Sequence, residues 1–180
     1  MQHAYPFLIR AARPDDLGAI LAVQAACYPP SMQEAGEVVL ARMGVAGQSC
    51  VVAEDGEGIC GYLFAYPSRL GKVTPLGAQF DAAPDADTLY LHDLAIAPHA
   101  HGRGLARALV DHLLAQARAR GLASSALVSV QDTAGFWSAL GYEASETTCS
   151  TARAALASYP GAARYMVRVL TGPGALSPSC

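Results

Sequence analysis

The spacing of hydrophobic residues changes partway along residues 88–121. Residues 89–96 form a short apolar run with branched and aromatic members, which predicts a buried strand, and Pro98 marks its end. From Leu105 to Leu114 the apolar residues recur at helical spacing, which predicts a helix with a broad buried face. The pattern therefore predicts a strand, a glycine-containing loop and a helix that begins near Gly104.

The same patterns predict the rest of the architecture. Further strands are expected at residues 7–11, 50–54, 59–66, 122–129 and 164–170, and further helices at residues 14–27, 34–43 and 133–140. Residues 67–87 lack periodicity and are rich in Pro, Gly and Asp, which indicates a long surface loop. Residues 28–34 contain two adjacent prolines, so we expect a mobile connection between the first two helices. The expected fold class is α/β, with about six to seven strands and about four helices.

Composition narrows the class of protein. A chain of 180 residues with 52% hydrophobic content suits one domain with an ample core. We find neither a charged leader with an apolar core nor an apolar run of bilayer length, and therefore expect a soluble, cytoplasmic protein without membrane contact. A net charge of −3 with scattered arginines argues against a nucleic-acid partner. Five cysteines without a CxxC pair predict reduced structural thiols and no metal site.

The loop before the central helix is a candidate anion site. Arg103 and Arg107 fall in or beside the first helical turn, where unpaired backbone N–H groups already make the potential positive. Gly102 and Gly104 allow the backbone to approach an anion and to direct several N–H groups at it. The loop alone fits a phosphate site and a plain tight turn equally well. No Gly-Lys-Ser or Gly-Lys-Thr ending follows, and Arg107 occupies the position where a dinucleotide fingerprint has a small residue.

Two motifs in this order resemble the GNAT superfamily of acyl-CoA N-acyltransferases. The first is the family's acetyl-CoA motif, Gln/Arg-x-x-Gly-x-Gly/Ala after a strand, which here reads His101, Gly102, Arg103, Gly104, Leu105, Ala106. The second is a Phe-Tyr pair followed by Leu-Gly-Phe, which here reads Phe136, Trp137, Leu140, Gly141, Tyr142. With the two-helix start, the similarity covers about residues 7–170. It implies a single N-acetyltransferase domain over residues 1–170, with a flexible tail over residues 171–180.

The resemblance also implies a cofactor-binding arrangement. A mixed, twisted sheet is expected to splay apart after the central strand. The pantetheine of acetyl-CoA, the co-substrate, is expected to bond to backbone near Leu94, Ala95 and Ile96. Its pyrophosphate is expected on residues 102–106, with His101, Arg107 and Trp137 beside the cofactor. Either a monomer or a homodimer is compatible with this arrangement.

The chemistry of amine acetylation requires a base or a chain of water molecules that removes the proton. An alkylamine with an ordinary pKa near about 10.4 is almost fully protonated at neutral pH, and only the neutral amine attacks a thioester. Alternation along the strand predicts that Tyr90, His92 and Leu94 share one face, with Asp93 on the other. Arylalkylamine N-acetyltransferases have His-x-His where this chain has Tyr90 and His92, so the resemblance favours His92 as the base and Tyr90 as a gate or relay. A buried structural histidine is the alternative.

The departing CoA thiolate lacks its usual proton donor. The family often uses the tyrosine of Phe-Tyr, but Trp137 stands there, and an indole N–H does not supply a proton. Tyr142, Ser138 or water could substitute, or the thiolate could leave with help from the positive helix end.

The acceptor is the least determined part of the prediction. Its candidate contacts are the residues in the connection and in the strand before the central one: Tyr28, Met32, Glu34, Phe64, Tyr66. Three functions remain open: a small-amine acetyltransferase, with an arylalkylamine as the favoured acceptor; a protein N-terminal or lysine acetyltransferase; and a non-catalytic acyl-CoA sensor. All three have the same fold, since acceptor specificity depends on loops.

Overall fold

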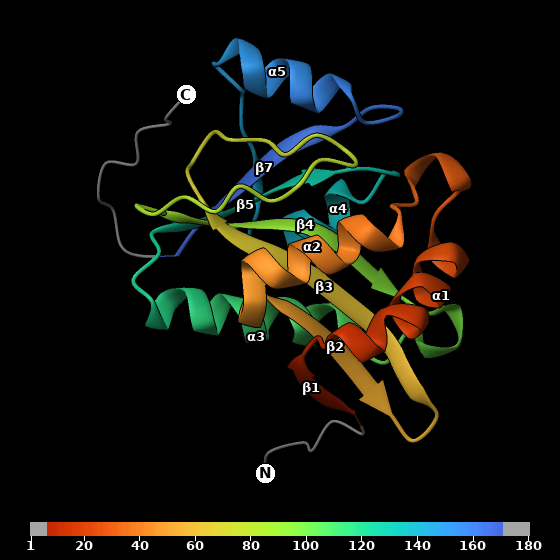
Figure 1. Cartoon of the computed structure of the whole chain (residues 1–180). Coiled ribbons are helices and arrows are strands. Elements are labelled where there is room, and N and C mark those ends of the chain that lie inside the picture. Colours follow the sequence, from red (N-terminus) through yellow and green to blue (C-terminus); the bar gives the residue numbers. More distant parts are fainter. Residues whose placement is uncertain (1–6, 171–180) are drawn as a thin grey trace.

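The computed structural model describes residues 7–170, and the tail predicted at residues 171–180 lies outside this range (Figure 1). The helices are α1 (Leu17–Cys27), α2 (Gly36–Ala46), α3 (Leu105–Ala119), α4 (Ala134–Ala139) and α5 (Ser150–Ala157). The strands are β1 (Leu8–Ala11), β2 (Cys50–Asp55), β3 (Gly58–Ser68), β4 (Thr88–Ile96), β5 (Ser124–Ser129), β6 (Glu143–Ala144) and β7 (Arg164–Val169). Short 3-10 turns lie at Pro14–Asp16, Pro30–Met32, Gly47–Ser49 and Pro98–Ala100.

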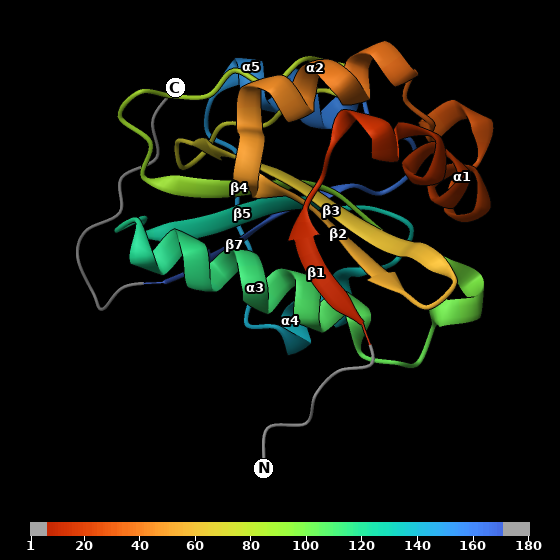
Figure 2. The ribbon, with the colours of Figure 1, turned by 60° about the horizontal axis from the view of Figure 1, so that its bottom comes forward.

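The strands form one mixed sheet in the order β1-β2-β3-β4-β5-β7-β6. Only the β4–β5 pair is parallel, and α3 makes the crossover between these two strands. Figure 2 shows α1, α2 and α5 on one face of the sheet and α3 and α4 on the other. The predicted mixed α/β fold is confirmed, while α5 and the two-residue strand β6 were not predicted.

Each face of the sheet has its own hydrophobic core. On the α3 face, Leu109, Leu113 and Leu114 are buried against Leu89 and Leu91 of β4. Ile20 of α1 and Val39 of α2 pack on the opposite face, where Ala152 and Ala155 of α5 complete the cover. The helical period of α3 and the alternation of the strands both follow from this division.

The central strand contains a β-bulge that changes which side chains share a face. Phe64 pairs with Asp93 and Ala65 pairs with Leu91, so His92 is an extra residue between the two pairs. The prediction that Leu94 shares a face with His92 is therefore wrong, because Leu94 packs with the α3-side core. Asp93 turns to the α1 and α2 face.

The two parallel strands separate after a short paired segment. Their pairing begins at Thr88 with Ser124 and ends at Leu91 with Leu127, so the second half of β4 has no β5 neighbour. This is the predicted splay. The opening places the polar backbone of residues 92–96 beside a cavity, because the parallel ladder stops there.

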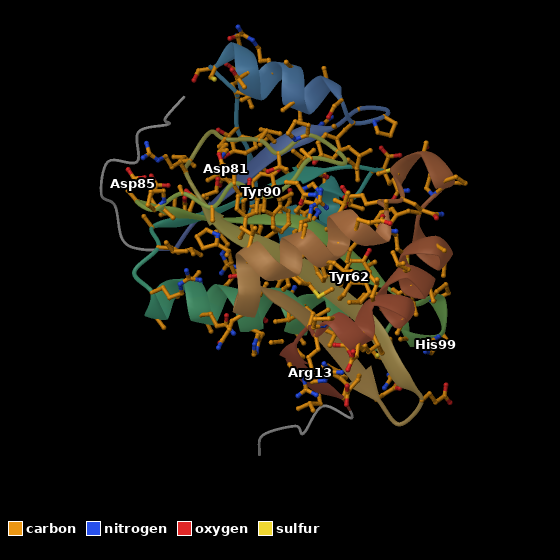
Figure 3. All side chains as sticks on the ribbon, viewed as in Figure 1. Arg13, Tyr62, Asp81, Asp85, Tyr90 and His99 are labelled. Atoms are coloured by element: carbon orange, nitrogen blue, oxygen red, sulfur yellow. The ribbon has the colours of Figure 1, made fainter. Side chains whose placement is uncertain are left out.

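The long loop over residues 69–87 is held to the fold at several points. Tyr165 accepts a hydrogen bond from Gly71 N–H at 2.8 Å, and the Tyr159 hydroxyl donates to Thr74 O at 2.7 Å. Figure 1 shows this loop, in yellow-green, crossing the sheet between α2 and α5. Asp81 and Asp85 lie on its outer side, where they pair with lysine and arginine side chains of the same loop (Figure 3). Its inner side forms part of the core.

No helix within residues 7–170 is both long and apolar enough to cross a bilayer. Within the same range, no group of three or more His, Cys, Asp or Glu side chains is placed to hold a metal ion.

Candidate functional site

A cavity of about 760 Å³ lies where β4 and β5 separate. It has a size suited to a small-molecule site. Its walls come from the end of α1, the second half of β4, the loop before α3, the end of β5 and the start of α4. Its polar and aromatic side chains are Cys27, Tyr28, His92, Asp93, His101, Arg107, Gln131, Thr133, Phe136 and Trp137.

The glycine loop presents backbone amides to one end of this cavity. Gly102 and Gly104 have φ values of +76° and +77°, which glycine adopts without the strain that a side chain brings. The first hydrogen bond of α3 runs from Ala108 N–H to Gly104 O, so the amides of the residues between them have no intrahelical acceptor. Leu105 and Ala106, which follow Gly104, line the cavity. The arrangement fits a pyrophosphate group, as predicted for residues 102–106.

The two arginines of this loop differ in their surroundings. Arg103 forms an ion pair with Asp55 of the β2–β3 hairpin, at 2.6 Å between Nη1 and Oδ2. This pairing lowers the pKa of the Asp55 carboxyl and raises that of the Arg103 guanidinium. Arg103 therefore already has an anionic partner within the protein. Arg107 is exposed and lines the cavity, so it is the arginine better placed to meet a phosphate.

The open edge of β4 carries two carbonyl groups bound by side chains. The Tyr28 hydroxyl donates to Leu94 O at 2.8 Å, and the Cys27 thiol donates to Ile96 O at 3.1 Å. His101 Nε2 also bonds Ile96 O, at 2.8 Å. These carbonyls lack β5 partners, so a ligand amide could take the place of a side-chain donor. The predicted pantetheine positions therefore carry backbone polar groups at the cavity, with Ala95 between them.

His92 lies at the other end of the cavity wall, with its side chain only 2% exposed. Its Nε2 is 3.4 Å from Glu34 Oε1, and its Nδ1 has no hydrogen-bond partner among residues 7–170. The Phe80 ring meets the imidazole edge-on, at 5.5 Å between ring centroids. The imidazole is thus enclosed, and Nδ1 is a buried nitrogen without a hydrogen-bond partner in the described residues.

Glu34 is a buried carboxylate bound from three sides. Arg42 Nη2 donates to its Oε1 at 2.7 Å, and Arg42 Nη1 pairs with its Oε2. Gly77 N–H of the long loop donates to Oε1 at 2.9 Å. Burial raises the Glu34 pKa, but the hydrogen bonds with His92 and Arg42 outweigh burial and lower it to about 2. Glu34 is therefore ionised at neutral pH.

The connection over residues 28–34 is tethered, in contrast to the mobile segment that was predicted. The Gln24 side chain clamps Glu34 from α1, donating to Glu34 O at 3.0 Å and accepting from Glu34 N–H at 3.1 Å. Gln33 Nε2 donates to Tyr28 O at 2.8 Å.

Asp93 is a cavity residue that the sequence did not reveal. The bulge directs its carboxylate toward Tyr62, whose hydroxyl donates to it at 2.7 Å, and the Tyr28 hydroxyl is also close. Burial raises the Asp93 pKa, an effect that the Tyr62 hydrogen bond partly offsets. Within residues 7–170 no lysine or arginine forms an ion pair with it. Regular alternation of side chains along the strand put Asp93 on the face opposite His92, and this was wrong because the bulge was not predicted.

Three predicted acceptor contacts lie in the core, as does Tyr90, which was predicted as a gate or relay. Tyr66 is fully buried and stacks on Phe80 at 4.3 Å between centroids, and Phe64 is 2% exposed. Met32 is buried and Tyr90 is 1% exposed, with Tyr90 beneath the long loop (Figure 3). None of these four lines the cavity, whereas Tyr28 does.

The predicted substitute acid also lies away from the cavity. Tyr142 is 1% exposed and its hydroxyl bonds Ser125 Oγ at 2.7 Å. Burial raises its pKa to about 12. Trp137 does line the cavity and meets the Tyr142 ring edge-on, so the indole separates Tyr142 from the site. The phenol at the cavity is Tyr28, whose pKa burial raises well above the ordinary value.

The splayed sheet, the amide-rich helix start and the cavity between them define an acyl-CoA-binding α/β protein. Residues 17–142 match the Acetyltransferase (GNAT) family, and this match covers more than half of the chain. The chain belongs to the GNAT family and is an acetyl-CoA-dependent N-acetyltransferase. No curated protein matches the sequence.

Solved structures share this fold at low sequence identity. A GNAT family acetyltransferase from Brucella melitensis in complex with acetyl-CoA is 26% identical, with a TM-score of 0.58 over 78% of this chain and 84% of that one. The ribosomal-protein-S18-alanine N-acetyltransferase from Escherichia coli is 15% identical, with a TM-score of 0.66 over 93% and 96%. The GphF GNAT-like decarboxylase in complex with isobutyryl-CoA is 22% identical, with a TM-score of 0.76 over 91% and 100%. The similarity to arylalkylamine N-acetyltransferases is not confirmed by these comparisons.

Proposed function

We propose that this enzyme acetylates a small primary amine, with His92 as the base. The observation that supports this proposal is that His92 and Asp93 line the same cavity as the amide-rich start of α3. Acetyl-CoA supplies the activated acyl group. The backbone amides after Gly104 and the Arg107 side chain hold its phosphates, and the open edge of β4 holds its amide arm.

The acceptor side of the cavity suits a cation. Asp93 is a buried carboxylate that forms no ion pair with a lysine or arginine of the described chain, and such a group favours a ligand that brings a positive charge. An alkylammonium ion meets this requirement. Bound near Asp93, it must still lose one proton before it can attack, and the free Nδ1 of His92 accepts that proton.

The aromatic preference rests on fewer residues than the sequence indicated. Tyr28, Phe136 and Trp137 are the rings that line the cavity, because Phe64 and Tyr66 are in the core. A ring buried against them contributes about 1.5 to 3 kcal/mol, which corresponds to about tenfold or more in kcat/KM over ethylamine. We therefore keep an arylalkylamine as the favoured acceptor.

The test is a thiol-release assay with acetyl-CoA and six acceptors compared in parallel. These are phenethylamine, tryptamine, ethylamine, spermidine, a lysine peptide and phenylalanine. The proposal expects the ring-bearing amines to be fastest. Phenylalanine, which adds a carboxylate beside the amine, should be poor because it meets Asp93. A preference for the peptide would instead indicate a protein acetyltransferase, and CoA binding without any transfer would indicate a sensor.

A further inference from the structure

Glu34 was expected to contact the acceptor, but it does not line the cavity and faces the imidazole of His92 from behind. Three nitrogens lie around its Oε1: Arg42 Nη2 and Gly77 N–H donate to it, and Nε2 of His92 faces it at 3.4 Å. An ionised carboxylate only accepts hydrogen bonds. The nitrogen that faces it must therefore carry a hydrogen.

This requirement fixes the tautomer of the neutral ring. If Nε2 carries the hydrogen, Nδ1 has the lone pair, and Nδ1 is the nitrogen without a partner in the described chain. The contact of 3.4 Å is long for an N–H···O bond, as is common for catalytic hydrogen bonds before substrate binds. Phe80 covers the imidazole edge-on and holds the ring in this orientation.

The carboxylate is itself fixed by contacts from three separate parts of the chain. Gln24 of α1 clamps its backbone, Arg42 of α2 binds both of its oxygens, and Gly77 of the long loop donates to it. Arg42 also binds the same loop, through Ala78 O at 3.1 Å from Nε. A buried ion pair adds little net stability compared with apolar residues of the same shape. Because the Glu34–Arg42 pair lies next to His92, which lines the cavity, its role is better explained by its effect on that histidine.

We propose that Glu34 is a positioning residue, which holds His92 with hydrogen on Nε2 so that Nδ1 takes the proton from the acceptor amine. This proposal rests on the proposed role of His92 as the base. The proton moves from the ammonium nitrogen to Nδ1, and the resulting imidazolium is stabilised by the Glu34 carboxylate at its other nitrogen. Arg42 binds both oxygens of that carboxylate and holds it in place.

The first test reads the tautomer directly and needs no substrate. Nitrogen-15 NMR of labelled imidazole in the whole enzyme at neutral pH should show His92 protonated at Nε2 and bare at Nδ1, with His92→Ala assigning the signal. The opposite tautomer would overturn the proposal. This result does not depend on turnover, so it stands apart from any failure of the proposed reaction.

The second test uses two variants that remove opposite charges from one ion pair. Glu34→Gln removes the anion beside the imidazole, so the acidic limb of the pH–rate profile should move down by about 1 pH unit or more, with kcat about 10- to 100-fold lower. Arg42→Gln removes the positive charge that offsets the Glu34 carboxylate, so the acidic limb of the pH–rate profile should move to higher pH. A purely structural role would slow both variants without moving the limbs in opposite directions, and that outcome would overturn the proposal.

The other charged and titratable groups around His92 are the same in both variants. They are Asp93, the next residue along β4, and Tyr90, whose ring lies 6.2 Å from the imidazole between centroids. If a single variant does not fold, Glu34→Gln/Arg42→Gln removes both charges together and leaves neither buried and unpaired. This double variant should keep the downward shift of the limb, and an unmoved limb would overturn the proposal. If His92→Ala retained full activity while the NMR result held, only the proposed base would be wrong.

Discussion

The two ends of the cavity are built in different ways. At the proposed cofactor end, backbone groups form the site, namely the amides at the start of α3 and the carbonyls of Leu94 and Ile96. At the proposed acceptor end, side chains form it: His92 lines the cavity, and Glu34 and Arg42, from two other segments, lie next to it outside the cavity. A backbone site depends on local conformation, while a side-chain network depends on long-range packing. The first end should therefore tolerate most side-chain changes, and the second should tolerate few.

The largest expected effect tests the acceptor end at its centre. Replacing His92 by alanine should lower kcat by about 10² to 10⁴ and remove the acidic limb of the pH–rate profile, because the base is gone. Acetyl-CoA affinity, measured by calorimetry, should remain, since the backbone site is unchanged. The matched control is His112→Ala in α3, a histidine outside the cavity that bonds Gln116. Full activity in His92→Ala would return His92 to a structural role.

The cofactor end was largely predictable from the sequence. The backbone conformation of this end depends on local sequence. The glycines predict the positive φ values at Gly102 and Gly104, and the helical spacing of apolar residues predicts a helix that starts at Leu105. The splay after the central strand came from the family resemblance. Arg103 is the exception, because its pairing with Asp55 joins residues far apart in sequence.

The acceptor end was predicted only as a set of residue types. Strand alternation is correct until an extra residue enters one strand, and no feature of the sequence marked the bulge that reorients Asp93 and Leu94. Likewise, an aromatic residue in a strand has the same pattern whether it faces a cavity or the core. Phe64 and Tyr66 prove to be core residues, while Tyr28 lines the cavity.

The buried ion pair between Glu34 and Arg42 should make the stability of the fold depend on pH. The Glu34 pKa falls from 4.5 to about 2 on folding, so the unfolded chain takes up this proton first as the pH falls. The stabilisation is complete above about pH 4.5 and is lost as the pH falls toward 2. Between pH 6 and pH 3, the free energy of unfolding should fall by roughly 2 kcal/mol because of this group.

Urea unfolding at these two pH values measures this loss. The control is Glu34→Gln/Arg42→Gln, which lacks the titrating group. Its loss of stability between the two pH values should be smaller than that of the unmodified enzyme by this amount. Other carboxylates, such as Asp16 beside Arg10, titrate in both proteins and cancel in the difference. Equal acid sensitivity in the two proteins would mean that Glu34 is not held ionised by its partners.

The smallest of these effects tests the cofactor end by changing its backbone. Gly104→Val places a branched side chain at φ +77°, which costs about 1 to 2 kcal/mol in stability, although its Cβ meets no protein atom within 4 Å. Because Gly104 lines the cavity together with Leu105 and Ala106, the added side chain should compete with the phosphates for space. Acetyl-CoA affinity should therefore fall by about tenfold or more, the value of a charge-assisted hydrogen bond.

Gly121→Val separates the lost affinity from the lost stability. Gly121 follows the other end of the same helix, with φ +74° and equally open surroundings, but it is outside the cavity. Both variants should therefore unfold more easily, by similar amounts, and only Gly104→Val should bind acetyl-CoA more weakly in calorimetry. If both variants bound acetyl-CoA as tightly as the unmodified enzyme, the amides after Gly104 would not hold the phosphates. The cofactor end would then depend on Arg107, a side chain, and the contrast between the two ends of the cavity would disappear.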